Sequence, residues 1–362
     1  MKFLSLEKEA FGLDISDLSL KIIKLKKKKH SFSVASFNQI PIAPGIIERG
    51  VIKNEDALVK IIQAACKKVK GKKLTTKYVV ASLPEERSFL QVIQMPIMKE
   101  EELILAVPFE AENYIPLPMS EVYLDFQVIQ PIENHLNHLD VLLVAMPKKI
   151  VNAYAVCLKK AGLVPLVFEI ESEAITRALI KDEISNAPVA LIDLGTNGTD
   201  FIIFAGRSIQ FTHSIPISLL QITEAIAQAL HVDFKKAEKI KINYNLKNPN
   251  TGQNSKKILQ AIVPILDNLA AQIKKYLDFY QDHAFHEHLG ANQKIAKIFL
   301  CGGGANFKGL PEFLSNKLGV TVEIKDFWAD FSLRTSNSDI DKNFLSFATA
   351  LGLALREINE VP

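Results

Sequence analysis

The chain has 362 residues, of which 48% are hydrophobic and 23% charged, and its formal net charge is +3. This composition is that of a globular protein, excludes a largely disordered one, and at this length suits two domains better than one core. The mild charge gives no indication of nucleic-acid binding, no stretch resembles a signal peptide, and no apolar run is long enough to span a bilayer.

The three cysteines, Cys66, Cys157 and Cys301, are odd in number and far apart. They match neither a disulfide framework nor a metal-ligand spacing, so we expect buried, reduced thiols in a cytoplasmic protein. Any association with a membrane is then expected to come through a partner.

The first predicted element is a β-hairpin over Phe11–Leu25, which reads FGLDISDLSLKIIKL. An apolar approach ends at Asp14, a short polar turn follows, and a second apolar strand leads out. Next, Asn54 is expected to cap an amphipathic helix, with Gly71 just past its carboxyl end. The lysine run at Lys26–His30 is interpreted as a solvated tip between strands, in preference to a contact with a membrane surface or an acidic partner.

The central part of the first half is predicted to be rich in strands, with one helix. The helix begins near Lys99, carries three glutamates in its first turn, is kinked or interrupted at Pro108 and ends by Pro116. The expected strands are Tyr78–Ser82, Phe89–Gln94, Val122–Ile129 and Asp140–Ala145. After them we expect a helix over Lys148–Ala161, a strand over Val164–Glu169 and a helix over Glu171–Lys181.

A second hairpin is predicted over Val189–Phe204, which reads VALIDLGTNGTDFIIF. Its first strand ends at Asp193, and its tip contains Gly195, Thr196, Asn197 and Gly198, residues that suit a tight turn requiring positive φ. A carboxylate beside exposed amides and hydroxyls suits a metal-bound phosphate. An ordinary hairpin with a Gly- and Thr-containing tip explains the same residues and stays an alternative.

The two hairpins correspond to each other, because Asp14 matches Asp193, Ser16 matches Gly195, and Ser19 lies near the Gly198 position. Two copies indicate duplicated halves that face each other across a cleft.

The second half continues with helices and a glycine motif. We expect helices over Ser218–Leu230 and Phe234–Tyr244, a loop over Leu246–Ser255, and a long helix over Lys256–His288 interrupted at Pro264. His283, His286 and His288 do not share one helix face, so a polar helix end explains them better than a metal. Lys297–Phe313, KIFLCGGGANFKGLPEF, predicts a strand, three glycines that let a nucleoside approach the backbone, and a helix from Leu310.

This order of hairpin, hairpin and strand–GGG–helix resembles the actin-like ATPase superfamily, with its two phosphate motifs and its adenosine motif. Glu100–Pro116, EEELILAVPFEAENYIP, and Phe344–Leu355, FLSFATALGLAL, extend the resemblance to the PilM family of cytoplasmic actin-like proteins in type IV pilus assembly.

The resemblance implies an α/β, actin-like (ribonuclease H-like) duplicated two-domain fold with a 1C-type α+β insertion. The expected divisions are residues 1–77, 147–185 and 342–362 for subdomain 1A, 78–146 for 1C, 186–217 and 293–341 for 2A, and 218–292 for 2B.

The resemblance also implies ATP and Mg²⁺ in the cleft between the halves. Asp14 and Asp193 are expected to hold the metal mostly through water. The expected nucleotide contacts are Asp14, Ser16, Ser19, Lys21, Asp193, Gly195, Thr196, Asn197, Gly198, Gly302, Gly303, Gly304 and Ala305. Asp193 and Glu171 are the catalytic candidates; Glu171 lies where the superfamily places a water-orienting acid, and a glutamate that favours a helix start explains it equally well.

The first hairpin departs from the family pattern, because Ser16 replaces a glycine and Asp17 adds a negative charge. Two like charges at ~4 Å and an effective dielectric near 20 repel by roughly 4 kcal/mol. Unless Asp17 points away or helps to hold the cation, phosphate binding is weakened, and the protein is at most a slow ATPase.

The resemblance implies a scaffold that binds the N-terminal peptide of a PilN-like membrane protein in the groove between 1A and 1C. The protein would then lie peripherally at the inner membrane, and the pilus motor ATPase complex and a homo-oligomer are further partners left open. An FtsA-like cell-division filament protein is the alternative, disfavoured because Arg356–Pro362 offers no amphipathic helix. A sugar kinase is a third, disfavoured by the 1C-type insertion.

Overall fold

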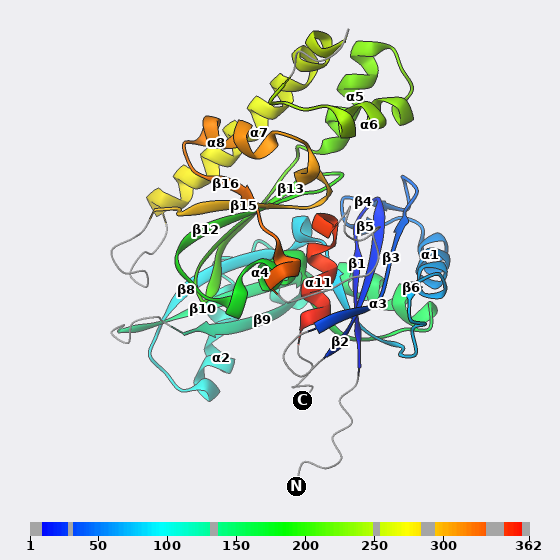
Figure 1. The fold of residues 1–362 in the computed structure, drawn as a ribbon. Helices are drawn as coiled ribbons and strands as arrows, with labels where there is room; N and C mark the ends of the chain where they lie inside the picture. Colours follow the sequence, from blue (N-terminus) through cyan, green and yellow to red (C-terminus); the bar gives the residue numbers. More distant parts are fainter. Residues whose placement is uncertain are drawn as a thin grey trace. The chain divides into compact units, whose positions relative to one another are not determined.

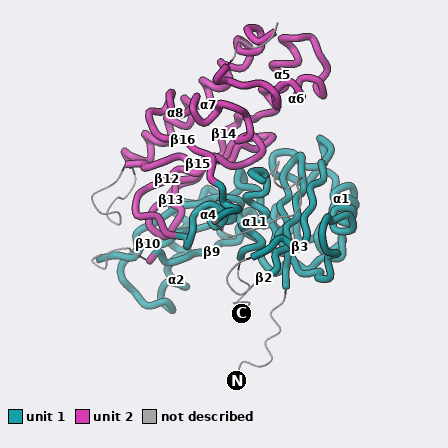
Figure 2. The backbone as a smooth tube through the Cα atoms, in the orientation of Figure 1, with its two compact units in different colours: residues 1–129, 137–183, 326–362 teal, residues 130–136, 184–325 magenta. Residues whose placement is uncertain are grey.

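The computed structural model describes residues 9–27, 32–130, 137–248, 254–283, 294–330 and 344–356. The chain forms two compact units (Figure 2). Unit 1 contains residues 1–129, 137–183 and 326–362, and unit 2 contains residues 130–136 and 184–325. The predicted tip at Lys26–His30 and the loop at Leu246–Ser255 lie partly outside the described residues, as do His286 and His288.

Unit 1 is built on a six-stranded sheet in the order β11-β7-β1-β2-β3-β6 (Figure 1). Strands β1, β2 and β3 form an antiparallel meander, whereas β7 runs parallel to β1 and β11 runs parallel to β7. The bounds are β1 Phe11–Ile15, β2 Ser19–Lys27, β3 Phe32–Pro41, β6 Lys70–Gly71, β7 Tyr78–Leu83 and β11 Val164–Ile170.

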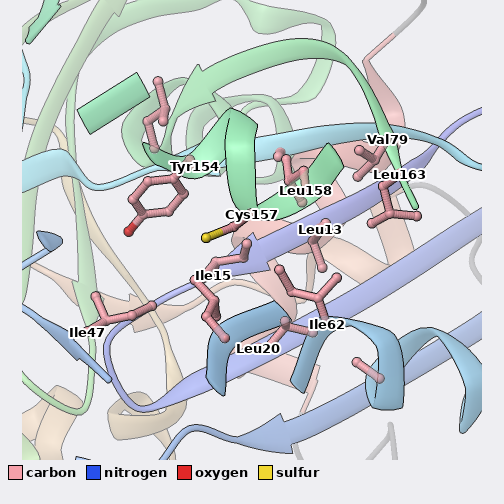
Figure 3. Packing of buried hydrophobic residues seen from close by; sticks show 14 of the residues in the cluster. Leu13, Ile15, Leu20, Ile47, Ile62, Val79, Tyr154, Cys157, Leu158 and Leu163 are labelled. Carbon is pink, nitrogen blue, oxygen red and sulfur yellow. The ribbon is translucent and has the colours of Figure 1, made fainter. Parts of the chain in front are cut away.

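One face of this sheet is covered by α1 (Glu55–Lys67) and α3 (Lys148–Lys160). Side chains alternate along β1, so Leu13 and Ile15 lie on this face and join a buried apolar cluster with Ile62 of α1 and Tyr154 of α3 (Figure 3). The predicted cap of α1 is confirmed, because the Asn54 side chain accepts a hydrogen bond from the Ala57 amide.

The opposite face of β1 packs against α11 (Ala348–Leu355), which also packs against α4 (Glu171–Leu179). The packing is close: a Cβ on Gly12 would lie 2.3 Å from the Ala350 carbonyl oxygen, and a Cβ on Gly352 would lie 1.7 Å from that of Ala174. By alternation, Asp14 shares this face of β1 with Gly12.

The inserted region is a second, three-stranded sheet in the order β8-β10-β9, packed against α2. The bounds are β8 Phe89–Pro96, α2 Glu100–Ala111, β9 Val122–Ile129 and β10 His138–Pro147. One expectation is corrected, because the strand from Tyr78 belongs to the six-stranded sheet and the insertion begins one strand later. Of the two effects expected at Pro108, the interruption is absent, since α2 runs through this residue.

Unit 2 is built on a five-stranded sheet in the order β14-β13-β12-β15-β16. Strands β12, β13 and β14 form an antiparallel meander. Strand β15 runs parallel to β12, and β16 runs parallel to β15, which matches the arrangement of β7 and β11 beside β1 in unit 1. The duplication expected from the two hairpins is therefore confirmed. The bounds are β12 Ser185–Leu194, β13 Thr199–Gly206, β14 Ser208–Ile215, β15 Lys297–Cys301 and β16 Val322–Ile324, with helices α5 Leu219–Leu230, α6 Phe234–Asn243, α7 Ser255–His283 and α8 Leu310–Leu318.

Three further expectations are wrong in detail. Gly71 does not end α1; it lies in β6, where its φ of +86° lets the backbone approach the Ala35 carbonyl oxygen. Helix α7 continues through Pro264. Residues from Asp326, expected in 2A, belong to unit 1, because the Phe327 ring packs 5.7 Å from the Phe344 ring.

The remaining elements are short. They are β4 Ile47–Glu48, β5 Val51–Ile52, α9 Phe327–Asp330 and the 3-10 turns η1 Glu85–Arg87, η2 Met119–Glu121, η3 Lys181–Glu183, η5 Gly303–Asn306 and η6 Phe344–Phe347. Among the described residues, no helix has the length and hydropathy needed to cross a bilayer.

Candidate functional site

The first candidate turn, in unit 1, is led by a buried ion pair. Asp14 lies opposite Lys21 across the β1–β2 ladder, and the Lys21 Nζ is 2.8 Å from Oδ2 of Asp14. The two residues are only 2% and 9% exposed. Adjacent strands therefore hold this carboxylate in one orientation through a charge-assisted hydrogen bond.

A residue that the sequence did not indicate also holds this carboxylate. The Ser82 hydroxyl at the end of β7 lies 3.4 Å from Oδ1 of Asp14 and accepts the Ile15 N–H at 3.0 Å. It follows a buried apolar run in a strand parallel to β1, and only that pairing brings it to Asp14.

The turn itself is closed by serines in place of glycine. The Ser16 amide donates to the Ser19 carbonyl oxygen at 2.9 Å, and the two hydroxyl oxygens lie 3.0 Å apart. Both predicted contact residues therefore meet in one tight turn. The Ser16 hydroxyl donates within the turn, to the Ser19 carbonyl oxygen at 3.1 Å or to the Ser19 hydroxyl, so the Ser19 hydroxyl keeps a proton that it can donate to an anion.

Asp17 points toward a neighbouring turn of unit 1. Its carboxylate accepts the Arg49 amide at 2.7 Å and the Gly50 amide at 3.0 Å, so it caps the turn between β4 and β5. Backbone amides stabilise this charge where it lies. The repulsion calculated for an Asp17 carboxylate directed at a phosphate does not apply to this conformation.

Glu171, at the first position of α4, is held by a second glutamate that the sequence did not indicate. The Glu85 amide donates to Oε2 of Glu171 at 3.1 Å, and the Ser172 amide donates to Oε2 of Glu85 at 3.0 Å. Glu85 is 4% exposed. The reciprocal contacts fix the η1 turn against the amino end of α4, which also favours the negative charges there.

The second candidate turn, in unit 2, begins at Asp193 near the end of β12. Asp193 lies opposite Asp200 of β13 and beside Cys301 of β15. Burial, followed by the neighbouring Asp193 carboxylate, raises the pKa of the Cys301 thiol well above its ordinary value. Cys301 is thus a buried neutral thiol, as expected, and it packs against a candidate metal-binding carboxylate.

The tip after Asp193 does not use positive φ, contrary to expectation, because neither Gly195 nor Gly198 adopts it. Gly195 is needed for a different reason: a Cβ there would lie 2.9 Å from the Gly198 carbonyl oxygen. Thr196 and Asn197 are exposed and can offer their polar groups to a ligand.

The glycine run after β15 is partly explained by internal packing. Gly302 has a φ of +81°, and a Cβ there would lie 2.1 Å from Oδ1 of Asp193. A Cβ on Gly304 would lie 2.2 Å from the Leu219 side chain of α5, and Ala305 is buried. Gly303 is the exposed glycine of the three and is the one able to border a ligand.

Within unit 2, the GGG motif therefore packs directly against Asp193, because only a residue without a Cβ fits between the backbone at position 302 and the Asp193 carboxylate. Among the described residues, no group of three or more His, Cys, Asp or Glu side chains could hold a metal ion by itself.

Comparisons with known proteins identify relatives of this fold. A family model described as type IV pilus assembly protein PilM matches residues 12–358. A chain of a solved PilM–PilN type IV pilus biogenesis complex is 26% identical, with 98% of this chain and 100% of that chain covered and a TM-score of 0.79.

More distant matches agree with the fold. The cell division protein FtsA of Helicobacter pylori is 26% identical over 164 residues, which are 40% of this chain and 32% of that protein. The chain thus spans about a third of the length of this relative. MreB5 of Spiroplasma citri bound to ADP is 12% identical with a TM-score of 0.55, over 94% of each chain. Together with the PilM chain, it confirms the expected actin-like α/β fold.

Proposed function

Because the chain belongs to the family of type IV pilus assembly protein PilM, we propose that it is a pilus scaffold that binds Mg·ATP and the N-terminal peptide of a PilN-like membrane protein. One observation carries this proposal: the chain aligns over 98% of its length with a chain of a solved PilM–PilN complex. Through that peptide the protein lies at the cytoplasmic side of the inner membrane.

The proposed nucleotide ligands are the two acid-led turns. Asp14 and Asp193 would hold Mg²⁺ through water, and Thr196, Asn197 and the Gly303 backbone would meet phosphate and adenosine. When bound, Mg²⁺ would neutralise part of the negative charge of the phosphates. Asp17 does not oppose binding as long as it caps the Arg49–Gly50 turn.

We propose that turnover, if any, is slow. Glu171 is the candidate for orienting a water, but its Oε2 already accepts the Glu85 amide. The Ser16 hydroxyl is held within its own turn, against the carbonyl and hydroxyl oxygens of Ser19. Both features favour a site that binds nucleotide for its structural effect over one organised for rapid hydrolysis.

The proposed peptide groove lies where the three-stranded sheet meets α3, within unit 1. Tyr123 of β9 is 48% exposed, and its hydroxyl donates to Oδ1 of Asn152 at 3.2 Å. Val156, one turn further along α3, is 40% exposed. Strand β9 is at an edge of its sheet, where an extended peptide can add main-chain hydrogen bonds.

Anisotropy of a labelled N-terminal peptide from the neighbouring PilN-like membrane protein tests this proposal. We expect saturable binding that Tyr123→Ala weakens about tenfold, a loss of roughly 1.4 kcal/mol. Tyr114→Ala is the matched control, because Tyr114 is also 48% exposed but lies just after α2. Absence of binding to the wild type, or equal affinity for the two variants, contradicts the groove assignment.

A further inference from the structure

Positive charge is concentrated in two segments of unit 1. Residues 18–47 and 57–84 contain thirteen lysines and no aspartate or glutamate. The whole chain has 43 lysines and arginines and 40 acidic residues, so 30 basic and 40 acidic residues remain elsewhere, a formal charge of −10. Such a separation of charge is typical of a protein that presents one basic surface to an anionic partner.

Strand pairing brings lysines of the two segments to one end of the six-stranded sheet. Near the end of β2, Lys26 lies opposite Ser33 of β3. On the far side of β3, the Lys72 amide donates to the Ala35 carbonyl oxygen at 2.8 Å. Neighbouring strands are about 4.8 Å apart, so Lys26 and Lys72 lie two strands and roughly 10 Å from each other.

A lysine before β7 joins the same end of the sheet. Lys77 directly precedes β7, which runs parallel to β1, whereas β2 runs antiparallel to β1. The start of β7 and the end of β2 therefore lie at the same end. The acid-led turn after Asp14 lies at the other end of β1. A ligand of the lysines would thus leave this candidate nucleotide turn uncovered.

The end of α1 adds further charge. Lys67 is the last residue of this helix, Lys68 is its C-cap, and β6 begins two residues later (Figure 1). The exposed lysines that gather here are called the basic end of unit 1, and they are Lys26, Lys67, Lys68, Lys72, Lys73 and Lys77.

Contacts within unit 1 use other lysines. Lys24 is paired with Glu9 at 2.8 Å, and the Lys70 ammonium lies 5.8 Å from the centre of the Phe37 ring. The pKa of the Glu9 carboxyl is lowered by its hydrogen bond to Lys24 and by the charge of Lys24, and Lys26 adds to this effect. The potential at this end is therefore positive even where a carboxylate is present.

Two structural explanations cover only part of the basic end. Lysines at a sheet edge prevent strand addition, which accounts for charge near the edge strand β6. That reason does not apply to Lys26, which lies on an interior strand. A solvated tip explains the run that begins at Lys26 when it is taken alone, but not its convergence with the lysines of residues 67–77.

The composition of this surface favours lipid over protein as its partner. Among the described residues, the large hydrophobic side chains that are exposed all lie outside residues 18–47 and 57–84. A protein–protein interface needs an apolar or aromatic centre. The surface of an anionic bilayer attracts exposed lysines through charge alone, and each lysine close to it strengthens binding by about fivefold.

We propose that the basic end of unit 1 binds the surface of a membrane that contains anionic phospholipids, without inserting into it. This contact goes beyond the proposed function and does not depend on it, because it requires no peptide. Where a PilN-like peptide also holds the protein, the lipid contact becomes intramolecular and is strengthened by its effective concentration.

Flotation of the full chain with lipid vesicles, in the absence of any peptide, tests the proposal. We expect the wild type to float with vesicles of about 30% phosphatidylglycerol in phosphatidylcholine at about 50 mM salt. It should not float with pure phosphatidylcholine, and about 500 mM salt should release it. A variant with Lys68→Gln, Lys72→Gln and Lys73→Gln should have a partition coefficient about 100-fold lower.

A variant with Lys235→Gln, Lys236→Gln and Lys239→Gln is the matched control, because it removes the same three charges from exposed positions of α6 in unit 2. Its partition coefficient should stay within about threefold of the wild type, a difference well below the loss expected at the basic end. Circular dichroism establishes that both variants are folded. The proposal is overturned if the wild type does not float with the anionic vesicles, or if the two variants lose binding equally.

Two further measurements separate this contact from other partners. Binding of the wild type to poly-glutamate through the same three lysines, without flotation, would assign the basic end to an acidic protein and overturn the proposal. The variant of the basic end should bind the PilN-like peptide as the wild type does. Because the vesicle assay contains no peptide, failure to float leaves the peptide groove untouched, and failure to bind the peptide leaves the lipid contact untouched.

Discussion

The ammonium nitrogen of Lys21 lies 2.8 Å from Oδ2 of Asp14, and both residues are buried. The first acid-led turn is thus held by a buried ion pair, with Ser82 on the other carboxylate oxygen. Breaking such a pair leaves one buried charge without compensation, which is more harmful than losing a pair at the surface.

We therefore predict that Lys21→Ala lowers the free energy of unfolding by about 3–5 kcal/mol. Lys160→Ala is the control, since Lys160 also lies 2.8 Å from a carboxylate, that of Glu55, but both side chains are about half exposed. Urea unfolding followed by circular dichroism measures both. Equal losses for the two variants would show that burial of the Lys21 pair is unimportant.

A second prediction concerns the glycine beside Asp193. Gly302→Ala should destabilise unit 2 by about 1–3 kcal/mol more than Gly319→Ala, because an added methyl group must displace the Asp193 carboxylate. Both glycines have positive φ, +81° and +69°, but nothing lies within 4 Å of a Cβ on Gly319. The difference between the two variants in urea unfolding isolates the clash from the backbone strain.

A third prediction is a dependence of stability on pH. Burial, followed by the nearby Glu169 carboxylate, raises the pKa of Glu173 from 4.5 to about 8. A carboxyl whose pKa is raised by folding stabilises the protein fully below its unfolded pKa, and this stability is lost as the pH rises through the folded value.

Glu173→Gln removes this titration. We expect the free energy of unfolding of the variant to match that of the wild type near pH 4.5 and to exceed it by roughly 1–2 kcal/mol near pH 8.5. This difference is smaller than the full pKa shift implies, because Glu173 is partly exposed and solvent screens its charge. Glu224→Gln makes the same change at an exposed position of α5. A difference between Glu173→Gln and the wild type that is constant between these pH values would contradict the assignment.

Much of this fold can be predicted from the sequence, because each hairpin is formed by residues that are close together along the chain. Phe11–Leu25 and Val189–Phe204 contain their own strands and turns, and the two acids stand at the same place in each. The duplication follows from that repetition, and the strand, turn and helix after Lys297 follow from apolar runs separated by glycine.

The expectations that failed depend on pairings between distant residues. Nothing local assigns β7 to the sheet of β1, since parallel partners lie far apart along the chain. Asp17 reaches amides 32 and 33 residues away, and Glu85 meets Glu171 from 86 residues away. Such contacts direct Asp17 away from its own turn, which is one of the alternatives left open for it, and they supply a partner for Glu171 that no motif indicates.

Calorimetric titration with Mg·ATP tests the central proposal, which is that Asp14 and Asp193 each contribute to the binding of Mg·ATP. Asp14→Asn and Asp193→Asn should each weaken binding by about tenfold or more, since each removes a charged ligand of the hydrated metal. Asp17→Asn is the control in the same turn as Asp14, and its affinity should stay within about twofold of the wild type, because that carboxylate faces the Arg49 and Gly50 amides. Wild-type affinity in folded Asp14→Asn and Asp193→Asn, or no binding by the wild type, would contradict the account.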